Sequence, residues 1–108
     1  MNNTATQNIQ PMKQLSVTEL KEWMANGKDF LLVDVREEWE RQNYNIGGMH
    51  IPMGELTGRT DEIPKDKEVI LYCEKGIRSV IVIQRLESLG FQNLFNLSGG
   101  IKAWKAAL

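Results

Sequence analysis

A continuous apolar stretch, a short glycine-containing loop and an amphipathic stretch follow one another between Val69 and Leu89. Residues 69–73 have the length and composition of a strand buried on both faces, and helical periodicity begins at Ser79. A short loop between a strand and a helix turns backbone N–H groups toward one point, where the helix dipole adds positive charge. This order of elements predicts a site for an anion at the end of a buried strand.

The chain has one cysteine, Cys73, and it ends this strand. A thiolate held there should have a lowered pKa, because the loop amides and the nearby cations Lys75 and Arg78 favour the charged form. Free cysteines often serve as small apolar core residues. A core position, however, requires neither Gly76 nor two cations directly after it. We therefore identify Cys73 as a candidate nucleophile.

The rest of the sequence predicts helices alternating with strands. We expect helices at residues 16–26, 37–42, 79–89 and after 99–100, with helical turns over 54–63. Strands are expected at residues 30–34, 49–52, 69–73 and 93–97. The alternation indicates an α/β domain, with a mainly parallel central sheet of about five strands flanked by helices on both faces. Ligands bind such sheets beyond the carboxyl ends of the strands, where Asp34 and Cys73 are both expected.

Composition narrows the class of partner. The chain has 108 residues, 42% of them hydrophobic, and a formal net charge of −1, so we expect a single domain with no nucleic-acid or membrane partner. Residues 1–12 resemble neither a signal peptide nor a membrane span and are predicted to be a disordered tail before a domain at 13–108. One cysteine and one histidine do not make a metal site. An unpaired reactive thiol suits a reducing compartment, which favours the cytoplasm.

Three motifs together resemble one known family. The loop Cys73-Glu-Lys-Gly-Ile-Arg-Ser79 resembles the active-site loop of the rhodanese (sulfurtransferase) family. The stretch Asp34–Glu40, followed by Gly47-Gly48 and Ile51-Pro52, is similar to its first signature, and Leu97–Trp104 resembles its C-terminal one. The resemblance covers about Leu15 to Trp104, with the motifs in the family's order, and implies a single rhodanese-like domain.

The resemblance also implies a mechanism, which is ping-pong sulfur transfer through Cys73. The thiolate takes sulfane sulfur from thiosulfate or a similar small donor and keeps it as a persulfide, which cyanide or a thiol then removes. The amides of residues 74–79 would hold the persulfide's charge. No cofactor is needed. A sulfur-carrier protein is a further partner consistent with the same chemistry.

The loop side chains have distinct expected roles. Lys75 would attract a dianionic donor, and Arg78 would bind loop carbonyls or the leaving sulfite. Gly76 lets the backbone bend toward the sulfur, and Ser79 is the expected N-cap of the following helix. Ile77 completes the loop. Glu74 departs from the family, which often has a basic residue there, and its charge beside the thiolate predicts modest turnover with thiosulfate.

Asp34 and Arg36 are expected to support the loop as a structural ion pair, with Glu40 an alternative partner for the arginine. The only histidine, His50, is interpreted as exposed or hydrogen-bonded near a strand end and not as a general base. Trp39 and Trp104 are predicted to be core or helix-docking aromatics.

Three alternatives to a thiosulfate sulfurtransferase remain open at this point. Phosphatases and arsenate reductases of the same fold place five residues between the cysteine and the arginine, whereas four separate Cys73 from Arg78. A non-catalytic docking module often lacks the cysteine. A sulfur-relay carrier, loaded by a desulfurase, would use the same cysteine chemistry.

Overall fold

The computed structural model describes residues 11–108, and its centre is a five-stranded sheet. The strands are β1 (Gln14–Leu15), β2 (Phe30–Asp34), β3 (Met49–His50), β4 (Glu68–Tyr72) and β5 (Leu94–Leu97). They lie in the order β1-β5-β4-β2-β3, and every neighbouring pair is parallel. The predicted parallel α/β sheet is confirmed. Asp34 pairs with Tyr72, so Cys73 follows β4 at the edge where β2 also ends.

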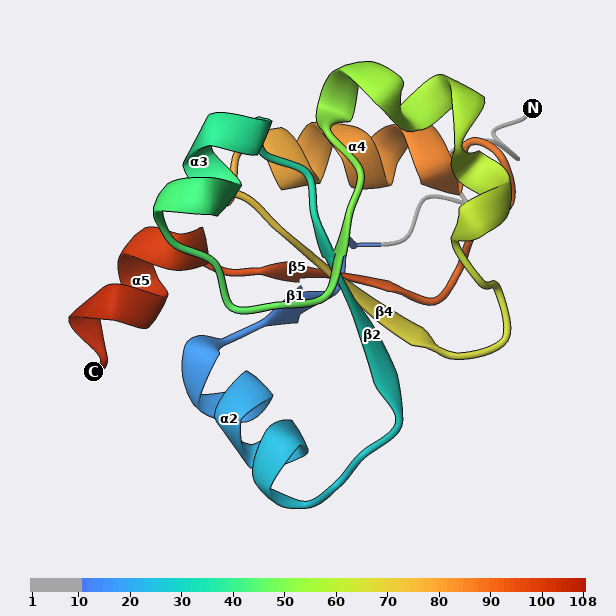
Figure 1. The fold of residues 1–108 in the computed structure, drawn as a ribbon. Helices are drawn as coiled ribbons and strands as arrows, with labels where there is room; N and C mark the ends of the chain where they lie inside the picture. Colours follow the sequence, from blue (N-terminus) through green and yellow to red (C-terminus); the bar gives the residue numbers. More distant parts are fainter. Residues whose placement is uncertain (1–10) are drawn as a thin grey trace.

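Helices cover both faces of this sheet (Figure 1). They are α2 (Val17–Ala25), α3 (Glu38–Asn43), α4 (Arg78–Glu87) and α5 (Gly100–Ala106), with short 3-10 helices η1 (Met53–Gly58) and η2 (Thr60–Glu62). One buried cluster joins the sheet to α4 and η1, and a second joins it to α2 and α5. Figure 1 shows α4 and α2 on opposite sides of the strands. The layers are therefore helix, sheet and helix, as the sequence pattern predicts.

The side chains of β4 alternate between these two clusters. Val69, Leu71 and Cys73 belong to the cluster beneath α4, while Ile70 and Tyr72 belong to the one beneath α2 and α5. All five are at most 1% exposed, and burying a large apolar side chain stabilises a fold by roughly 1.5–3 kcal/mol. This alternation directs the cysteine toward α4, whose N-terminus completes the site.

Two predicted core positions are wrong. Trp39 is 65% exposed, because α3 is a six-residue helix that buries none of its residues. Leu89, which the expected helix over residues 79–89 would direct inward, is 57% exposed, because α4 ends at Glu87 and the helical period stops with it. Trp104, by contrast, packs against the second cluster and docks α5 as predicted.

The N-terminal part of the chain adds a strand that the sequence analysis did not contain. The two-residue β1 pairs with β5 through Gln14–Asn96 and Leu15–Leu97, and it is too short for period-2 alternation to identify it. Of the predicted tail, residues 1–10 lie outside the described part, while Met12 packs against the cluster beneath α4. Within residues 11–108, the helices are all too short or too polar to cross a lipid bilayer.

Candidate active site

The Cys73 sulfur lies at the bottom of a loop that surrounds it with donors. The backbone N–H groups of Gly76 and Ser79 donate to Sγ at 3.1 Å and 3.5 Å, and the Ser79 hydroxyl lies 3.4 Å away. Gly76 lies within the bent loop over residues 74–77, and Ser79 is in the first turn of α4. The structure thus brings together the strand end, the loop and the helix N-terminus in the predicted arrangement. These donors stabilise a negative charge on the Cys73 sulfur.

Two glycines allow the loop to take this shape. Gly76 has a φ of 86°, and a Cβ there would lie 3.1 Å from the backbone nitrogen of Gly99. Gly100 has a φ of 58°, and a Cβ there would overlap the carbonyl oxygen of Cys73. The close approach lets Ile101 donate its N–H to that carbonyl at 3.0 Å. The first turn of α5 therefore satisfies the backbone carbonyl of the cysteine itself.

The pKa of the Cys73 thiol is lowered from its ordinary value. Burial opposes ionisation most strongly, since Sγ belongs to a residue that is 1% exposed. The hydroxyl of Ser79 and the backbone N–H groups of Ser79, Gly76 and Lys75 together outweigh that effect by binding the thiolate. Hydrogen bonds, more than neighbouring cations, therefore produce the shift.

Ser79 corrects one sequence prediction. It does not cap the helix, because α4 already begins at Arg78 with Ile77 in the N-cap position. Its hydroxyl instead lies between the sulfur and the side-chain carbonyl of Asn96, to which it donates. A hydroxyl has one proton. When Cys73 is a thiol, the Ser79 proton goes to Asn96; when Cys73 ionises, turning that proton to the sulfur stabilises the thiolate.

Asn96 is held in place by further contacts. It is a buried residue of β5, and its Nδ2 donates to the side-chain carbonyl of Gln14 at 3.0 Å and to the Gly76 carbonyl at 3.4 Å. Sequence reasoning missed it. The detectable signal is a polar residue at a core-facing position, because Asn96 shares the α4 side of β5 with Leu94, which belongs to that cluster.

Arg78 is bound by a carboxylate that the sequence analysis assigned to another arginine. Its Nη1 and Nη2 donate to the two oxygens of Glu40 at 2.7 Å and 2.8 Å. The hydrogen bonds from Arg78 lower the pKa of Glu40 to about 2. Glu40 belongs to α3, so this bidentate pair ties that helix to the start of α4.

Arg36 and Asp34 form the predicted ion pair, and both are almost completely buried. The Arg36 Nε and Nη2 donate to the two Asp34 oxygens, each at 3.0 Å, and Nη2 also donates to the Tyr44 carbonyl at 2.6 Å. Nη1 reaches the carboxylate of Glu74 at 3.5 Å. Arg36 therefore partly compensates the negative charge of Glu74, which we expected to lie beside the thiolate.

A pocket of about 270 Å³ opens above the sulfur. Its lining residues are Glu40, Cys73, Glu74, Lys75, Ile77 and Arg78. Lys75 and Ile77 are exposed at its rim. The volume suits a small donor or the end of a larger one.

His50 lies apart from this group. Its Nε2 is 2.7 Å from the Arg36 carbonyl, and its Nδ1 is 3.3 Å from a carboxylate oxygen of Glu38. Both ring nitrogens are thus occupied near the end of β3, as the hydrogen-bonded interpretation predicts. The ring does not line the pocket above Cys73.

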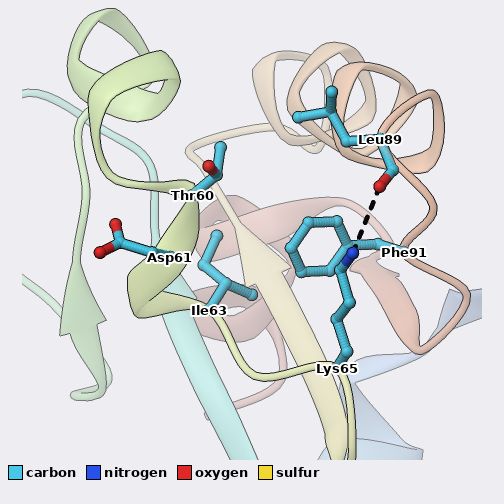
Figure 2. A pocket seen from close by; sticks show the side chains of 6 residues that line it. All are labelled: Thr60, Asp61, Ile63, Lys65, Leu89 and Phe91. Carbon is cyan, nitrogen blue, oxygen red and sulfur yellow. Dashed lines mark hydrogen bonds between the residues drawn. The ribbon is translucent and has the colours of Figure 1, made fainter.

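A second hollow, shown in Figure 2, lies beside the residues that lead into β4 and β5, at the opposite edge of the sheet. There, the Lys65 ammonium stands 4.7 Å from the centre of the Phe91 ring and donates to the Leu89 carbonyl at 3.3 Å. The remaining lining residues are Thr60, Asp61 and Ile63. No cysteine or histidine is among the residues that line this hollow.

Comparison with known proteins agrees with this geometry. The family model of the rhodanese-like domain matches residues 16–107, which include strands β2 to β5, the loop and α5. The chain belongs to the rhodanese family. Its signatures thereby acquire a structural meaning: the first carries the ion pair beneath the loop, the second carries the sulfur, and the third brings the N-terminus of α5 against the loop carbonyls.

Individual rhodanese relatives are similar over nearly their full length. A sulfurtransferase of Allochromatium vinosum is 35% identical over 94 residues, covering 86% of this chain and 88% of its own. The thiosulfate sulfurtransferase GlpE of Coxiella burnetii is 31% identical over 97 residues, covering 88% and 91%. The crystal structure of a single-domain sulfurtransferase from Saccharomyces cerevisiae superposes with a TM-score of 0.76 at 26% identity, covering 93% and 94%. The relatives support sulfur transfer as the class of reaction.

Proposed function

We propose that this rhodanese is a sulfurtransferase that carries sulfane sulfur on Cys73, taking it from thiosulfate or a similar donor and passing it to cyanide or a thiol. One observation carries the proposal: the Cys73 sulfur accepts backbone N–H groups from Gly76 and Ser79 at the bottom of an open pocket. Such a cradle favours an anionic sulfur before and after it accepts a second sulfur atom.

The chemistry balances without a cofactor. The Cys73 thiolate attacks the outer sulfur of thiosulfate, a new S–S bond forms, and the old S–S bond breaks as sulfite leaves with the electron pair. Cyanide or a thiolate then attacks the outer sulfur of the persulfide. Thiocyanate or a new persulfide leaves, and the Cys73 thiolate returns with its electron pair.

The loop residues divide this work. Gly76 and Ser79 hold the charged sulfur, Lys75 attracts an anionic donor at the rim, and Ile77 offers an apolar contact there. Asp34 and Arg36 support the loop from below. A sulfur-carrier protein would enter the same open pocket with its terminal sulfur. Because a free thiol persists in a reducing compartment, we assign the activity to the cytoplasm.

Intact-protein mass spectrometry of wild type and Cys73→Ser, before and after incubation with thiosulfate, tests the proposal. We expect wild type alone to gain the mass of one sulfur atom, to lose it on addition of cyanide, and to release thiocyanate. A variant that gains the same mass without Cys73 would place the chemistry elsewhere. If wild type gains no sulfur from thiosulfate, mercaptopyruvate or a desulfurase, the sulfurtransferase assignment fails.

A further inference from the structure

The charged groups around the Cys73 pocket cancel one another. Two carboxylates, Glu40 and Glu74, face two cations, Lys75 and Arg78. When Cys73 ionises, the lining of the pocket therefore carries one net negative charge. This balance is unfavourable for a dianion such as thiosulfate, because both of its charges approach a site that offers no net attraction.

Glu40 is the decisive member of this set. It occupies both terminal nitrogens of Arg78, at 2.7 Å and 2.8 Å, and these nitrogens would otherwise form a bidentate fork for an oxyanion. With a pKa of about 2, this carboxylate is ionised throughout the working pH range. A donor that binds through Arg78 must therefore displace the Glu40 carboxylate from the guanidinium.

Glu40 is also fixed from its own helix. One of its oxygens accepts the backbone N–H of Glu37 at 3.0 Å, which closes a capping box at the start of α3. The carboxylate is therefore held at the first turn of α3 while it binds Arg78. Moving it aside for an incoming anion would break both interactions.

The rim of the pocket offers apolar contact. Ile77 lines the pocket and is 65% exposed, beside the exposed Lys75. An inorganic oxyanion gains little from an exposed isoleucine, whereas the carbon portion of an organic donor packs against it.

We propose that Glu40 is a specificity-determining residue, which selects organic persulfides with a single charge over dianionic thiosulfate as sulfur donors. The inference rests on the proposed function and assigns its donor class. In the reaction, the Cys73 thiolate attacks the outer sulfur of the persulfide, the donor's S–S bond breaks, and the donor thiolate leaves with the electron pair.

The test compares two donors and three proteins. Rates of Cys73 persulfide formation are measured by rapid quench and mass spectrometry with thiosulfate and with the persulfide of N-acetylcysteine amide, whose only charge is on the persulfide group. The proteins are wild type, Glu40→Gln, and Glu38→Gln as the matched control. Glu38 lies on the same helix and gives the same change in net charge, but it pairs with His50 and not with Arg78.

We expect Glu40→Gln to raise the second-order rate constant with thiosulfate about tenfold, the effect on a dianion of removing one charge several ångströms away in a water-like medium. The rate with the organic persulfide should change by less than about threefold on the same reasoning. Glu38→Gln should leave both rates near wild type. Added salt should raise the thiosulfate rate of wild type more than that of Glu40→Gln, because it screens the repulsion.

Two results would overturn the inference while leaving the proposed function intact. One is an equal loss of rate with both donors in Glu40→Gln, which would make Glu40 only a support for the loop. The other is an unchanged preference between the two donors. If no protein forms a persulfide with either donor, and wild type also gains no sulfur from mercaptopyruvate or a desulfurase, the proposed function itself fails.

Discussion

Two buried polar networks hold the active-site loop from opposite sides, and they differ in charge. Toward β2, Asp34 and Arg36 form an ion pair that reaches the loop at Glu74. Toward β5, neutral hydrogen bonds join Asn96 to Ser79, whose hydroxyl contacts the sulfur. The charged network therefore contacts the loop without touching the nucleophile, whereas the neutral one ends on it.

Because one network is charged and the other neutral, they should contribute differently to stability and to the reactivity of Cys73. A guanidinium keeps its proton at any working pH, so the pair of Arg36 and Asp34 has no proton to exchange with the site. A hydroxyl between two acceptors turns its proton from one to the other. We infer that the charged network mainly holds the fold, while the neutral network adjusts the pKa of Cys73.

The largest expected effect is a loss of stability when the charged network of Asp34 and Arg36 is broken. Arg36→Met should lower the free energy of unfolding by about 3–5 kcal/mol, because the buried Asp34 carboxylate loses both guanidinium hydrogen bonds and keeps Arg41 as its one nearby cation within residues 11–108. Urea denaturation of wild type and variant measures the loss. In the double variant Asp34→Asn/Arg36→Met the loss should be smaller than in Arg36→Met, since the buried carboxylate charge is gone. A loss below about 1 kcal/mol in Arg36→Met would contradict the structural role.

On the neutral side, Asn96→Leu should cost less stability and change the chemistry more. The loss should be about 1–3 kcal/mol, because the buried Gly76 carbonyl loses a donor, while Gln14 keeps the hydrogen bond from Ser98. The pKa of Cys73 should fall further, since the Ser79 proton then has only the sulfur as acceptor. The pH dependence of alkylation by iodoacetamide reports that pKa.

The same substitution in a Ser79→Ala background separates two explanations. If Asn96 acts through the hydroxyl, Asn96→Leu should no longer move the pKa of Cys73 once Ser79 is absent. A shift that persists would mean that Asn96 acts by holding the loop through the Gly76 carbonyl. A rise of the Cys73 pKa in the single variant Asn96→Leu would also mean that Asn96 acts through the Gly76 carbonyl.

The contrast between the networks also explains what could be predicted from the sequence. Asp34 and Arg36 lie two residues apart in one motif, and Cys73, Gly76 and Ser79 lie in another, so local patterns were sufficient to find them. The central strands β2 and β4 followed from apolar runs of strand length, whereas the two-residue β1 did not. Short-range signals of this kind are the most dependable ones in a single sequence.

The missed contacts join residues that are distant in the chain. Asn96 binds Gln14 across 82 positions, and Arg78 binds Glu40 across 38. The pairing of Glu40 with Arg78 depends on where α3 packs in the fold. No local sequence pattern predicts that position. Ser79 was misassigned for the same reason: a serine near a helix start favours a cap, and only the tertiary structure shows the sulfur and Asn96 beside it.

The smallest expected effect on stability, and the most direct test of the neutral network, comes from Ser79→Ala. It should lower the free energy of unfolding by about 1 kcal/mol and raise the pKa of Cys73, because the thiolate loses the hydroxyl that lowers it. The midpoint of alkylation against pH should move upward, opposite to the shift in Asn96→Leu. Ser98→Ala serves as the control, since Ser98 donates to Gln14 at the far end of the same network. If Ser79→Ala and Ser98→Ala moved the midpoint equally, the hydroxyl beside the sulfur would have no special part in holding the thiolate, and the backbone N–H groups would account for the lowered pKa.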